Sequence, residues 1–410
     1  MALRNSGARC TPSIVRMNQP LPRRAITCLS FAAFGSGIAL RVNDALLPRL
    51  AGDFGIGLGQ AAQVISWFAI AYGLAQLLFG PLGDRLGKYR VIAWGTAACA
   101  LSSALCALAG SFEMLRLARV LAGATAAAII PLSMAWIGDV VDYDRRQPVL
   151  ARFLIGQILG LTVGVWFGGF AADHLGWRTP FWGLTGLFAL IALLLLDTER
   201  RLPPEAQLRR VVAGSALSRM VREFGQILAL PWARLILATV FLEGLFLYGP
   251  FAFIASHLHG NFGLSLSLAG GLVMLFGLGG FVFAMGAARI VPALGEVGLA
   301  RWGGALLFLA LLSLGLSPVW WWGGPACLLA GLGFYMLHNT LQLNATQMAP
   351  AQRGAAVSAF ASCFFLGQSA GVGLAGHAVG WLGTGWVMGL GATGVLAVAL
   401  HFAWRRQHKA

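Results

Sequence analysis

Several charged residues lie inside long apolar stretches of the sequence, where a charge needs a chemical reason. Glu243 stands among phenylalanine and leucine residues. A charge at the centre of a membrane costs about 2.5–3.5 kcal/mol, so a retained one requires a partner or a water-filled cavity. A carboxyl group in that place can bind and release a proton near neutral pH. Glu243 is therefore a candidate for proton coupling, and the alternative is a hydrogen-bonded acid that holds helices together.

Other titratable groups inside apolar stretches offer the same chemistry. Arg41 and Asp44 are three residues apart, so they share one face of a helix and can form an ion pair. A pair that forms in only one conformation is a switch, whereas a permanent pair is structural. Arg119 begins the buried part of another stretch. His338 is a candidate proton relay, because histidine is the side chain suited to proton transfer near neutral pH. Its alternative role is hydrogen bonding between helices.

Polar residues also follow one face of two apolar stretches. In 320–348 they step by three, one, three and four residues, which is the spacing of one helical face. Such a face should look into a helix bundle, because lipid offers no hydrogen bonds. Aromatic side chains can add an adaptable apolar wall, or they can face lipid or the core. The candidate cavity residues are Gln63, Trp67, Tyr72, Gln76, Trp136, Tyr248, Tyr335, Asn339 and Gln342.

The elements that carry these residues are membrane-spanning helices. The chain has 410 residues, of which 58% are hydrophobic and 10% charged, whereas soluble domains are about 25% charged. Apolar runs of about 18–25 residues are long enough to cross a bilayer. The first run is too long for a signal peptide and is expected to be retained. The expected spans are 25–48, 61–82, 90–110, 114–138, 150–172, 179–197, 233–256, 268–291, 297–317, 320–348, 354–377 and 380–404.

The basic residues predict how these spans are oriented. Most of the 29 Lys and Arg residues lie in the two tails or in connections that all fall on one side of the membrane. Positive residues mark the cytoplasmic side, so both termini are expected there. The net charge of +15 then reflects topology, and we expect no nucleic-acid partner. The six cysteines show no metal or disulfide spacing, and we expect no cofactor and no metal.

A long basic connection divides the chain into two six-helix halves. The expected parts are an N-terminal tail at 1–24, a first half at 25–197, a linker at 198–232, a second half at 233–404 and a C-terminal tail at 405–410. FLIGQILGLTVG, from Phe153, and FFLGQSAGVGLAG, from Phe364, share a G-Q-x-x-G pattern in the fifth helix of each half. Transporters built from two such repeats bind substrate between the halves, near the middle of the membrane.

Three motifs resemble signatures of the major facilitator superfamily. Gly80-Pro-Leu-Gly-Asp84-Arg85-Leu-Gly87-Lys88 resembles its G-x-L-a-D-R-x-G-R/K loop. Arg119-x-x-x-Gly123 resembles its helix-4 signature, in which a buried arginine is linked to proton coupling. A third motif, made by Gly160, Gly164, Gly168 and Gly169, resembles the exporter pattern G-x-x-x-G-P-x-x-G-G, with Val165 in place of the proline.

The resemblance implies an all-α membrane protein of twelve helices that works by alternating access. In the loop motif, Asp84 could pair with a basic partner from a neighbouring helix and latch the halves in one state. Its alternative role is a solvated loop that only sets topology. The closest branch is that of bacterial twelve-helix drug and sugar exporters, which resemble drug:proton antiporters. The resemblance therefore implies an inner-membrane carrier that exports a small amphipathic compound or drug in exchange for protons, and it implies a protein that functions as a monomer within membrane lipid.

Other functions remain open at the level of sequence. Val165 in place of the proline leaves a proton symporter or a narrow sugar or metabolite carrier as alternatives. A sensor built on the same fold would bind without flux. A membrane-embedded enzyme is disfavoured, because the sequence lacks HExxH, a GxSxG at a helix start and the nucleotide loop GxxxxGK[ST]. We therefore expect a protein that is not an enzyme.

Overall fold

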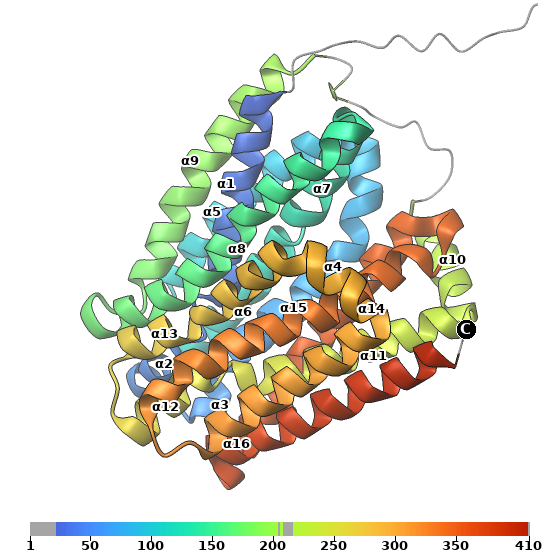
Figure 1. Ribbon diagram of the computed structural model, residues 1–410. Coiled ribbons are helices and arrows are strands. Elements are labelled where there is room, and N and C mark those ends of the chain that lie inside the picture. The colour runs from blue at the N-terminus through green and yellow to red at the C-terminus, as the bar shows by residue number, and fades with distance from the viewer. Residues whose placement is uncertain (1–21, 204–205, 208–215, 409–410) are drawn as a thin grey trace, which may run out of the picture.

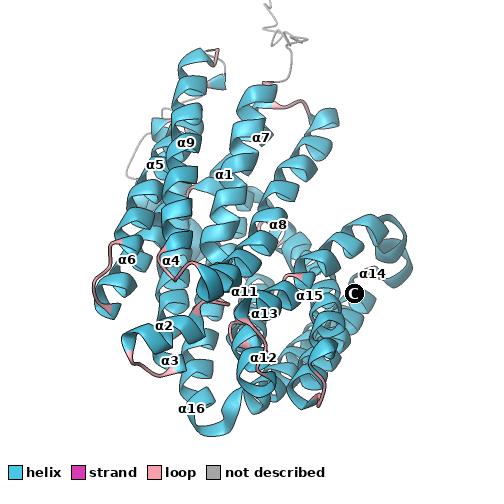
Figure 2. Cartoon of the chain, turned by 90° about the vertical axis from the view of Figure 1, so that its left-hand side faces the viewer, coloured by secondary structure: helices cyan, strands magenta, loops and turns pink. Residues whose placement is uncertain are grey.

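The computed structural model describes residues 22–203, 206–207 and 216–408. These residues form helices joined by short connections, and no strand occurs among them (Figure 2). The expected N-terminal tail up to residue 21, part of the linker and the last two residues lie outside the described part.

The helices of the first half of the chain are α1 (Arg23–Arg41), α2 (Leu47–Phe54), α3 (Leu58–Ala61), α4 (Gln63–Leu86), α5 (Lys88–Ala107), α6 (Phe112–Ala126), α7 (Ile129–Val140), α8 (Tyr143–His174) and α9 (Thr179–Arg201). Those of the second half are α10 (Ala216–Ala229), α11 (Pro231–Phe251), α12 (Ile254–Phe262), α13 (Leu266–Val273), α14 (Leu275–Leu316), α15 (Gly323–Gln347) and α16 (Arg353–Gln407). Short 3₁₀ turns lie at Trp320–Trp322 and Pro350–Gln352.

Among the described residues, eight helical stretches are long and apolar enough to cross a membrane. Two of them, Leu266–Leu316 and Pro350–Gln407, are far longer than one crossing needs. Each is broken by a glycine with positive φ, Gly295 at 59° and Gly383 at 78°, a conformation that glycine adopts without steric cost. Divided there, and counted with α1 and α15, the stretches are consistent with the twelve expected spans.

The first span differs from its expectation. The apolar segment 25–48 was expected to form one helix, but α1 ends at Arg41 and the turn 42–46 separates it from α2. Pro48 lies in the first turn of α2, where its missing N–H is tolerated. The helix therefore restarts at Leu47, and Asp44 lies in the turn and not on the helix.

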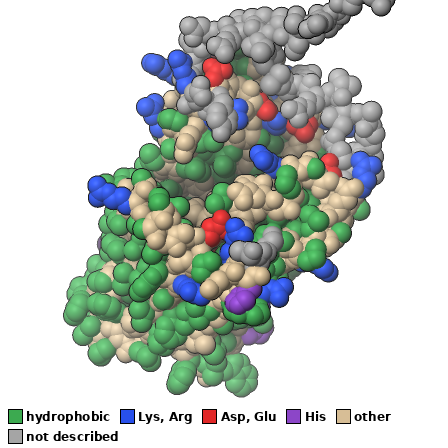
Figure 3. All heavy atoms as spheres, turned by 45° about the vertical axis from the view of Figure 1, so that its right-hand side comes forward, with side chains coloured by type: hydrophobic (Ala, Val, Ile, Leu, Met, Phe, Trp, Pro, Cys, Tyr) green, Lys and Arg blue, Asp and Glu red, His purple; other side chains and the backbone are tan. Residues whose placement is uncertain are grey.

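The surface of the bundle is that of a membrane protein. Large hydrophobic side chains are exposed on most of the long helices, including Trp381 at 91%, Met285 at 74% and Leu193 at 66%. Hydrophobic side chains cover most of the lower part of the face shown in Figure 3. Water would not tolerate an apolar surface of this extent, whereas lipid does. The chain is therefore a multi-pass membrane protein.

Two large hydrophobic clusters and one small one, formed by Phe283, Leu299 and Met336, fill the interior of the described part. The large ones divide between the halves. One is drawn mainly from α1 to α9 and the other mainly from α11 to α16. In Figure 1 the two groups of helices converge where α2, α3, α12 and α13 lie, and they diverge toward α7 and α10. We call the end of the molecule where α2, α3, α12 and α13 lie (Figure 1) the closed end.

Glycines pack the inner helices backbone to backbone, in the same way in both halves. A Cβ added at Gly160 of α8 would collide with the carbonyl oxygen of Phe34 in α1. A Cβ added at Gly371 of α16 would collide with the carbonyl oxygen of Leu245 in α11. The glycines that make such contacts with α1 are Gly156, Gly160 and Gly164, Gly168 makes one with Val42 in the turn after α1, and those that make them with α11 are Gly367 and Gly371. The G-Q-x-x-G repeat thus has one packing role in both halves.

Substituting Gly160 should separate α1 from α8. The Cβ that Gly160→Ala adds would overlap the carbonyl oxygen of Phe34. Such overpacking lowers the free energy of unfolding by about 1–3 kcal/mol. We expect a lower thermal midpoint for the purified variant in detergent. Gly186→Ala in α9 is the matched control, because nothing lies within 4 Å of its added Cβ. Equal midpoints for the two variants would contradict this packing.

Candidate transport cavity

A cavity of about 720 Å³ lies between the two halves. Its walls come from α1, α4, α7 and α8 on one side and from α11 and α13 to α16 on the other. Leu343 and Thr346 line it near the C-terminal end of α15. This is the end away from the closed end, because Gly323 begins α15 beside Leu258 of α12. This volume and the mixture of aromatic and polar walls suit a drug-sized ligand.

Most of the candidate cavity residues line this space. The polar face of α15 turns into it, as Tyr335, His338, Asn339, Gln342 and Thr346 all contact the cavity. Tyr72 and Gln76 of α4 and Tyr248 of α11 line it as well. Gln157 of α8 and Thr162 one turn further are polar lining residues that the sequence reasoning missed, although Gln157 stands in the G-Q-x-x-G repeat.

Three candidate cavity residues lie elsewhere. Gln63 accepts a hydrogen bond from Arg116 at 3.0 Å, and Trp67 is 41% exposed with Arg116 over its ring. Trp136 is buried and donates to the carbonyl oxygen of Ala206 at 3.0 Å. Gln63 misses the cavity that Gln76 lines because the two residues lie on different sides of α4. At 3.6 residues per turn they face directions about 140° apart. One polar side of α4 therefore looks into the cavity and the other does not.

Glu243 and His338 form a pair that joins α11 to α15. The imidazole Nδ1 of His338 lies 2.8 Å from Oε2 of Glu243. Glu243 is 0% exposed, and its other oxygen, Oε1, has no hydrogen-bond partner in the described part. His338 lines the cavity and Glu243 does not, so the imidazole stands between the buried carboxyl group and the cavity. This arrangement can pass a proton from cavity water to the carboxyl group.

Aromatic rings surround the imidazole of His338. The ring centroids of Phe334, Phe364 and Phe360 lie 4.8, 4.7 and 5.3 Å from its own. Among the described residues, Glu243 is the polar group that hydrogen-bonds the imidazole and positions the ring. The sequence named Glu243 and His338 as separate candidates and did not predict that they meet.

Arg41 reaches from the first half into the second. Its Nη1 lies 3.5 Å from Oδ2 of Asp44, and both side chains are buried. Its guanidinium lies over the rings of Tyr248, at 4.1 Å, and Phe251, at 5.4 Å, both in α11. Such cation–π contacts stabilise a desolvated cation by about 2 kcal/mol. Arg41 therefore contacts both halves, while Asp44 stays within the first.

Arg119 ties three helices of the first half together. It is buried in α6, and it donates to the carbonyl oxygens of Val64 at 3.2 Å and Ala39 at 3.1 Å. Its guanidinium also lies over the ring of Phe68, at 4.1 Å. It does not line the cavity.

The charged loop between α4 and α5 forms its ion pairs within the first half. Lys88 pairs with Asp84 at 3.4 Å and also with Asp139 of α7. Gly87 turns the chain with φ 96°, and Arg85 is exposed. Asp84 lies in α4, and its partner Lys88 is a basic residue of the neighbouring helix α5; both belong to the first half, so this pair does not join the two halves in the present conformation. Asp84 pairs with Lys88 because these residues are four apart in sequence and lie on one side of the tight corner between α4 and α5.

The closed end is sealed by contacts between the halves. The carboxylate of Asp173, at the end of α8, accepts from the backbone N–H of Leu266 at 3.1 Å and of Ser267 at 2.7 Å, and from the hydroxyl of Ser267 at 2.5 Å. It thus caps the N-terminus of α13, where negative charge is favourable. On the other flank, Ser369 of α16 donates to the carbonyl oxygen of Ser66 at 2.9 Å.

Sequence reasoning missed Asp173. The signal was present, since this acid directly follows an apolar span. Its partner could not be identified from sequence, because Ser267 lies in the other half of the chain.

Comparison with known proteins decides the family. Residues 29–372 match the family model described as Major Facilitator Superfamily. The chain belongs to the major facilitator superfamily. It is thus a transporter and not an enzyme, as expected. The expected all-α membrane fold is confirmed as well, and the twelve expected spans are consistent with it.

Relatives within the superfamily include exporters. The uncharacterized MFS-type transporter YceJ of Bacillus subtilis is 27% identical over 81% of this chain and 83% of its own length. The multidrug export protein EmrB of Escherichia coli is 29% identical, over 45% of this chain and 36% of that protein. The multidrug efflux pump LfrA of Mycolicibacterium smegmatis is 30% identical, over 48% of this chain and 38% of that protein.

Solved structures share the fold. The human organic anion transporter MFSD10 (TETRAN) superposes with a TM-score of 0.68 at 21% identity, over 93% of this chain and 99% of that one. A POT family transporter in complex with 5-aminolevulinic acid superposes with a TM-score of 0.76 at 13% identity, over 92% and 95%.

Proposed function

We propose that this transporter exports small amphipathic compounds, drugs among them, across the bacterial inner membrane in exchange for protons. The observation that carries the proposal is the buried Glu243–His338 pair beside a cavity lined by both halves. A carboxyl group that reaches the cavity only through an imidazole can take up a proton from one side and release it to the other. The partial matches to EmrB and LfrA support export of several compounds.

We place both termini in the cytoplasm, because most Lys and Arg residues lie at the tails and at connections on that side. The closed end is then periplasmic, and the cavity faces inward. Residues 25–197 and 233–404 act as two rocking bodies around it, with 198–232 as the linker. The two large hydrophobic clusters support this division. Because the cavity is formed by one chain, a monomer suffices for transport.

Arg41 and Arg119 have separate tasks in this proposal. Arg41 contacts Tyr248 of α11, so a movement of α11 changes the environment of its guanidinium group. Its ion pair with Asp44 is the second element that couples proton movement to transport. Arg119 joins α6 to α4 and α1 by hydrogen bonds, and it thereby positions α1, the helix that carries Arg41.

The loop at 80–88 is proposed as a latch of the opposite, outward-facing state. When the cytoplasmic ends close, the Asp84–Lys88–Asp139 cluster can exchange partners with the second half. Asp84→Asn should then lower transport severalfold and leave the amount of folded protein in the membrane unchanged. Asp142→Asn, an exposed acid at the same end, is the control. Full activity of Asp84→Asn would remove the latch from the account.

The export proposal is tested by a susceptibility panel in a bacterium that lacks its own efflux pumps. We expect the wild-type chain to confer resistance to several unrelated amphipathic compounds. Resistance to none of them would favour a proton symporter or a narrow sugar or metabolite carrier, and a flux screen of such compounds would follow. No resistance and no flux, together with binding of a compound to the purified chain, would indicate a sensor.

A further inference from the structure

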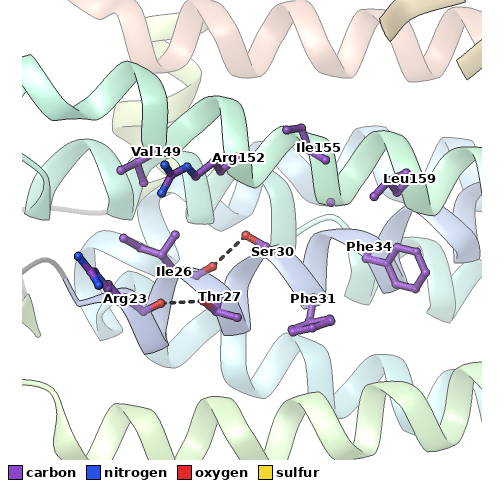
Figure 4. A pocket seen from close by; sticks show the side chains of 11 residues that line it. Arg23, Ile26, Thr27, Ser30, Phe31, Phe34, Val149, Arg152, Ile155 and Leu159 are labelled. Carbon is purple, nitrogen blue, oxygen red and sulfur yellow. Dashed lines mark hydrogen bonds between the residues drawn. The ribbon is translucent and has the colours of Figure 1, made fainter. Parts of the chain in front are cut away.

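A second concave site lies on the flank of the first half, apart from the central cavity. It is a groove of about 710 Å³ between α1 and α8 (Figure 4). Arg23, Phe31 and Phe34 line it from α1, and Arg152, Ile155 and Leu159 line it from α8. It shares no lining residue with the transport cavity.

The groove has a cationic end and an apolar length. In Figure 4 the side chains of Arg23 and Arg152 lie at the same end of the groove, and Phe31, Ile155 and Leu159 follow away from it. Those three apolar side chains are 53%, 45% and 51% exposed. An exposed apolar surface of this kind on a spanning helix pair contacts lipid.

The two arginines have no acidic partner in the part of the chain that the structure describes. Among the described residues, no carboxylate lies within ion-pair distance of Arg23 or Arg152, although the adjacent Arg24 pairs with Asp197 at 2.5 Å. Two unpaired cations beside an apolar surface form a site for a ligand that is anionic at one end and apolar at the other.

The length of the groove fits one leaflet of a bilayer. Arg23 begins α1, and Phe34 lies eleven residues further. At 1.5 Å per residue this is about 16 Å, which is half of a hydrocarbon core of about 30 Å. The cationic end therefore lies at headgroup level and the apolar end near the middle of the membrane.

We propose that this groove binds an anionic phospholipid. The phosphate lies between the guanidinium groups of Arg23 and Arg152, and an acyl chain follows Phe31, Ile155 and Leu159. Because the lipid contacts both α1 and α8, its binding stabilises this helix pair. The proposal depends on neither the direction nor the coupling of transport.

The test is native mass spectrometry of the full chain in neutral detergent, titrated with phosphatidylglycerol or with phosphatidylcholine of the same acyl chains. We expect the first phosphatidylglycerol to bind tighter than the first phosphatidylcholine. Arg23→Gln and Arg152→Gln should each weaken it about fivefold, as expected for one basic residue near a lipid headgroup. Phosphatidylcholine binding should stay unchanged.

Arg234→Gln is the matched control, since Arg234 is an exposed arginine near the start of α11 in the other half. Equal phosphatidylglycerol affinity in wild type and the double variant would overturn the proposal. So would an equal loss in Arg234→Gln, which would indicate a general charge effect. Displacement of the lipid by inorganic phosphate alone would assign the arginines to a free-phosphate site instead.

Discussion

Glu243→Gln should abolish proton-driven resistance while the protein still folds and binds its substrates. Gln keeps the size of the side chain and can still hydrogen-bond His338, but it cannot carry a proton. The charge-assisted hydrogen bond becomes a neutral one, which costs about 1 kcal/mol and leaves the fold intact. The measurement is the resistance of the pump-deficient host at equal membrane levels of wild type and variant.

Two comparisons make this result specific. Glu113→Gln changes an acid that is exposed and pairs with Arg116 at the surface, so resistance should stay at the wild-type level. His338→Gln should fail like Glu243→Gln, because the imidazole is the path between cavity and carboxyl group. If the two residues act as one unit, the double variant loses no more than either single variant. Wild-type resistance in Glu243→Gln would remove this residue from the coupling path.

Asp173→Asn should open the closed end. The carboxylate of Asp173 receives three hydrogen bonds from α13, and hydrogen bonds to a charged group contribute about 1.5–3 kcal/mol. Losing the charge should shift the equilibrium toward the outward-facing state about tenfold, since 1.4 kcal/mol corresponds to a factor of ten.

Alkylation of a cysteine placed inside the closed end measures this shift. Ala45 is 0% exposed and faces α13 near Gly270, so Ala45→Cys should react with a membrane-impermeant maleimide only when the end opens. We expect about tenfold faster alkylation when Asp173→Asn is added, in line with the population shift. Asp53→Asn is the control, because Asp53 pairs with Arg49 within α2 and does not bridge the halves. An unchanged rate in Asp173→Asn would show that its contacts do not hold this end closed.

The sequence predicted well those features that depend on local pattern. The polar face of α15 follows from helical spacing alone, and it does line the cavity. The superfamily follows from short motifs, and the family match confirms it. The end of α1 at Arg41 was missed, because Ala45, Leu46 and Leu47 resume the apolar pattern after Asn43 and Asp44 and hide the turn.

Features that depend on contacts between distant helices could not be predicted. Glu243 and His338 are 95 residues apart in sequence, and only the packing of α11 against α15 brings them to 2.8 Å. Asp173 and Ser267 belong to different halves, so their contact depends on the conformational state. Trp136 was chosen as an aromatic residue of an apolar span, but its indole N–H binds Ala206, which no pattern in the sequence indicates.

We propose that proton movement through Glu243 and His338 drives substrate across the membrane. The direct measurement uses purified chain in proteoliposomes, with an imposed pH gradient and a fluorescent amphipathic compound that the wild type exports from cells. We expect accumulation on the acidic side in the wild type, collapse on dissipation of the gradient, and background levels in Glu243→Gln. Equal accumulation with and without the gradient, or an undiminished rate in Glu243→Gln, would contradict the account.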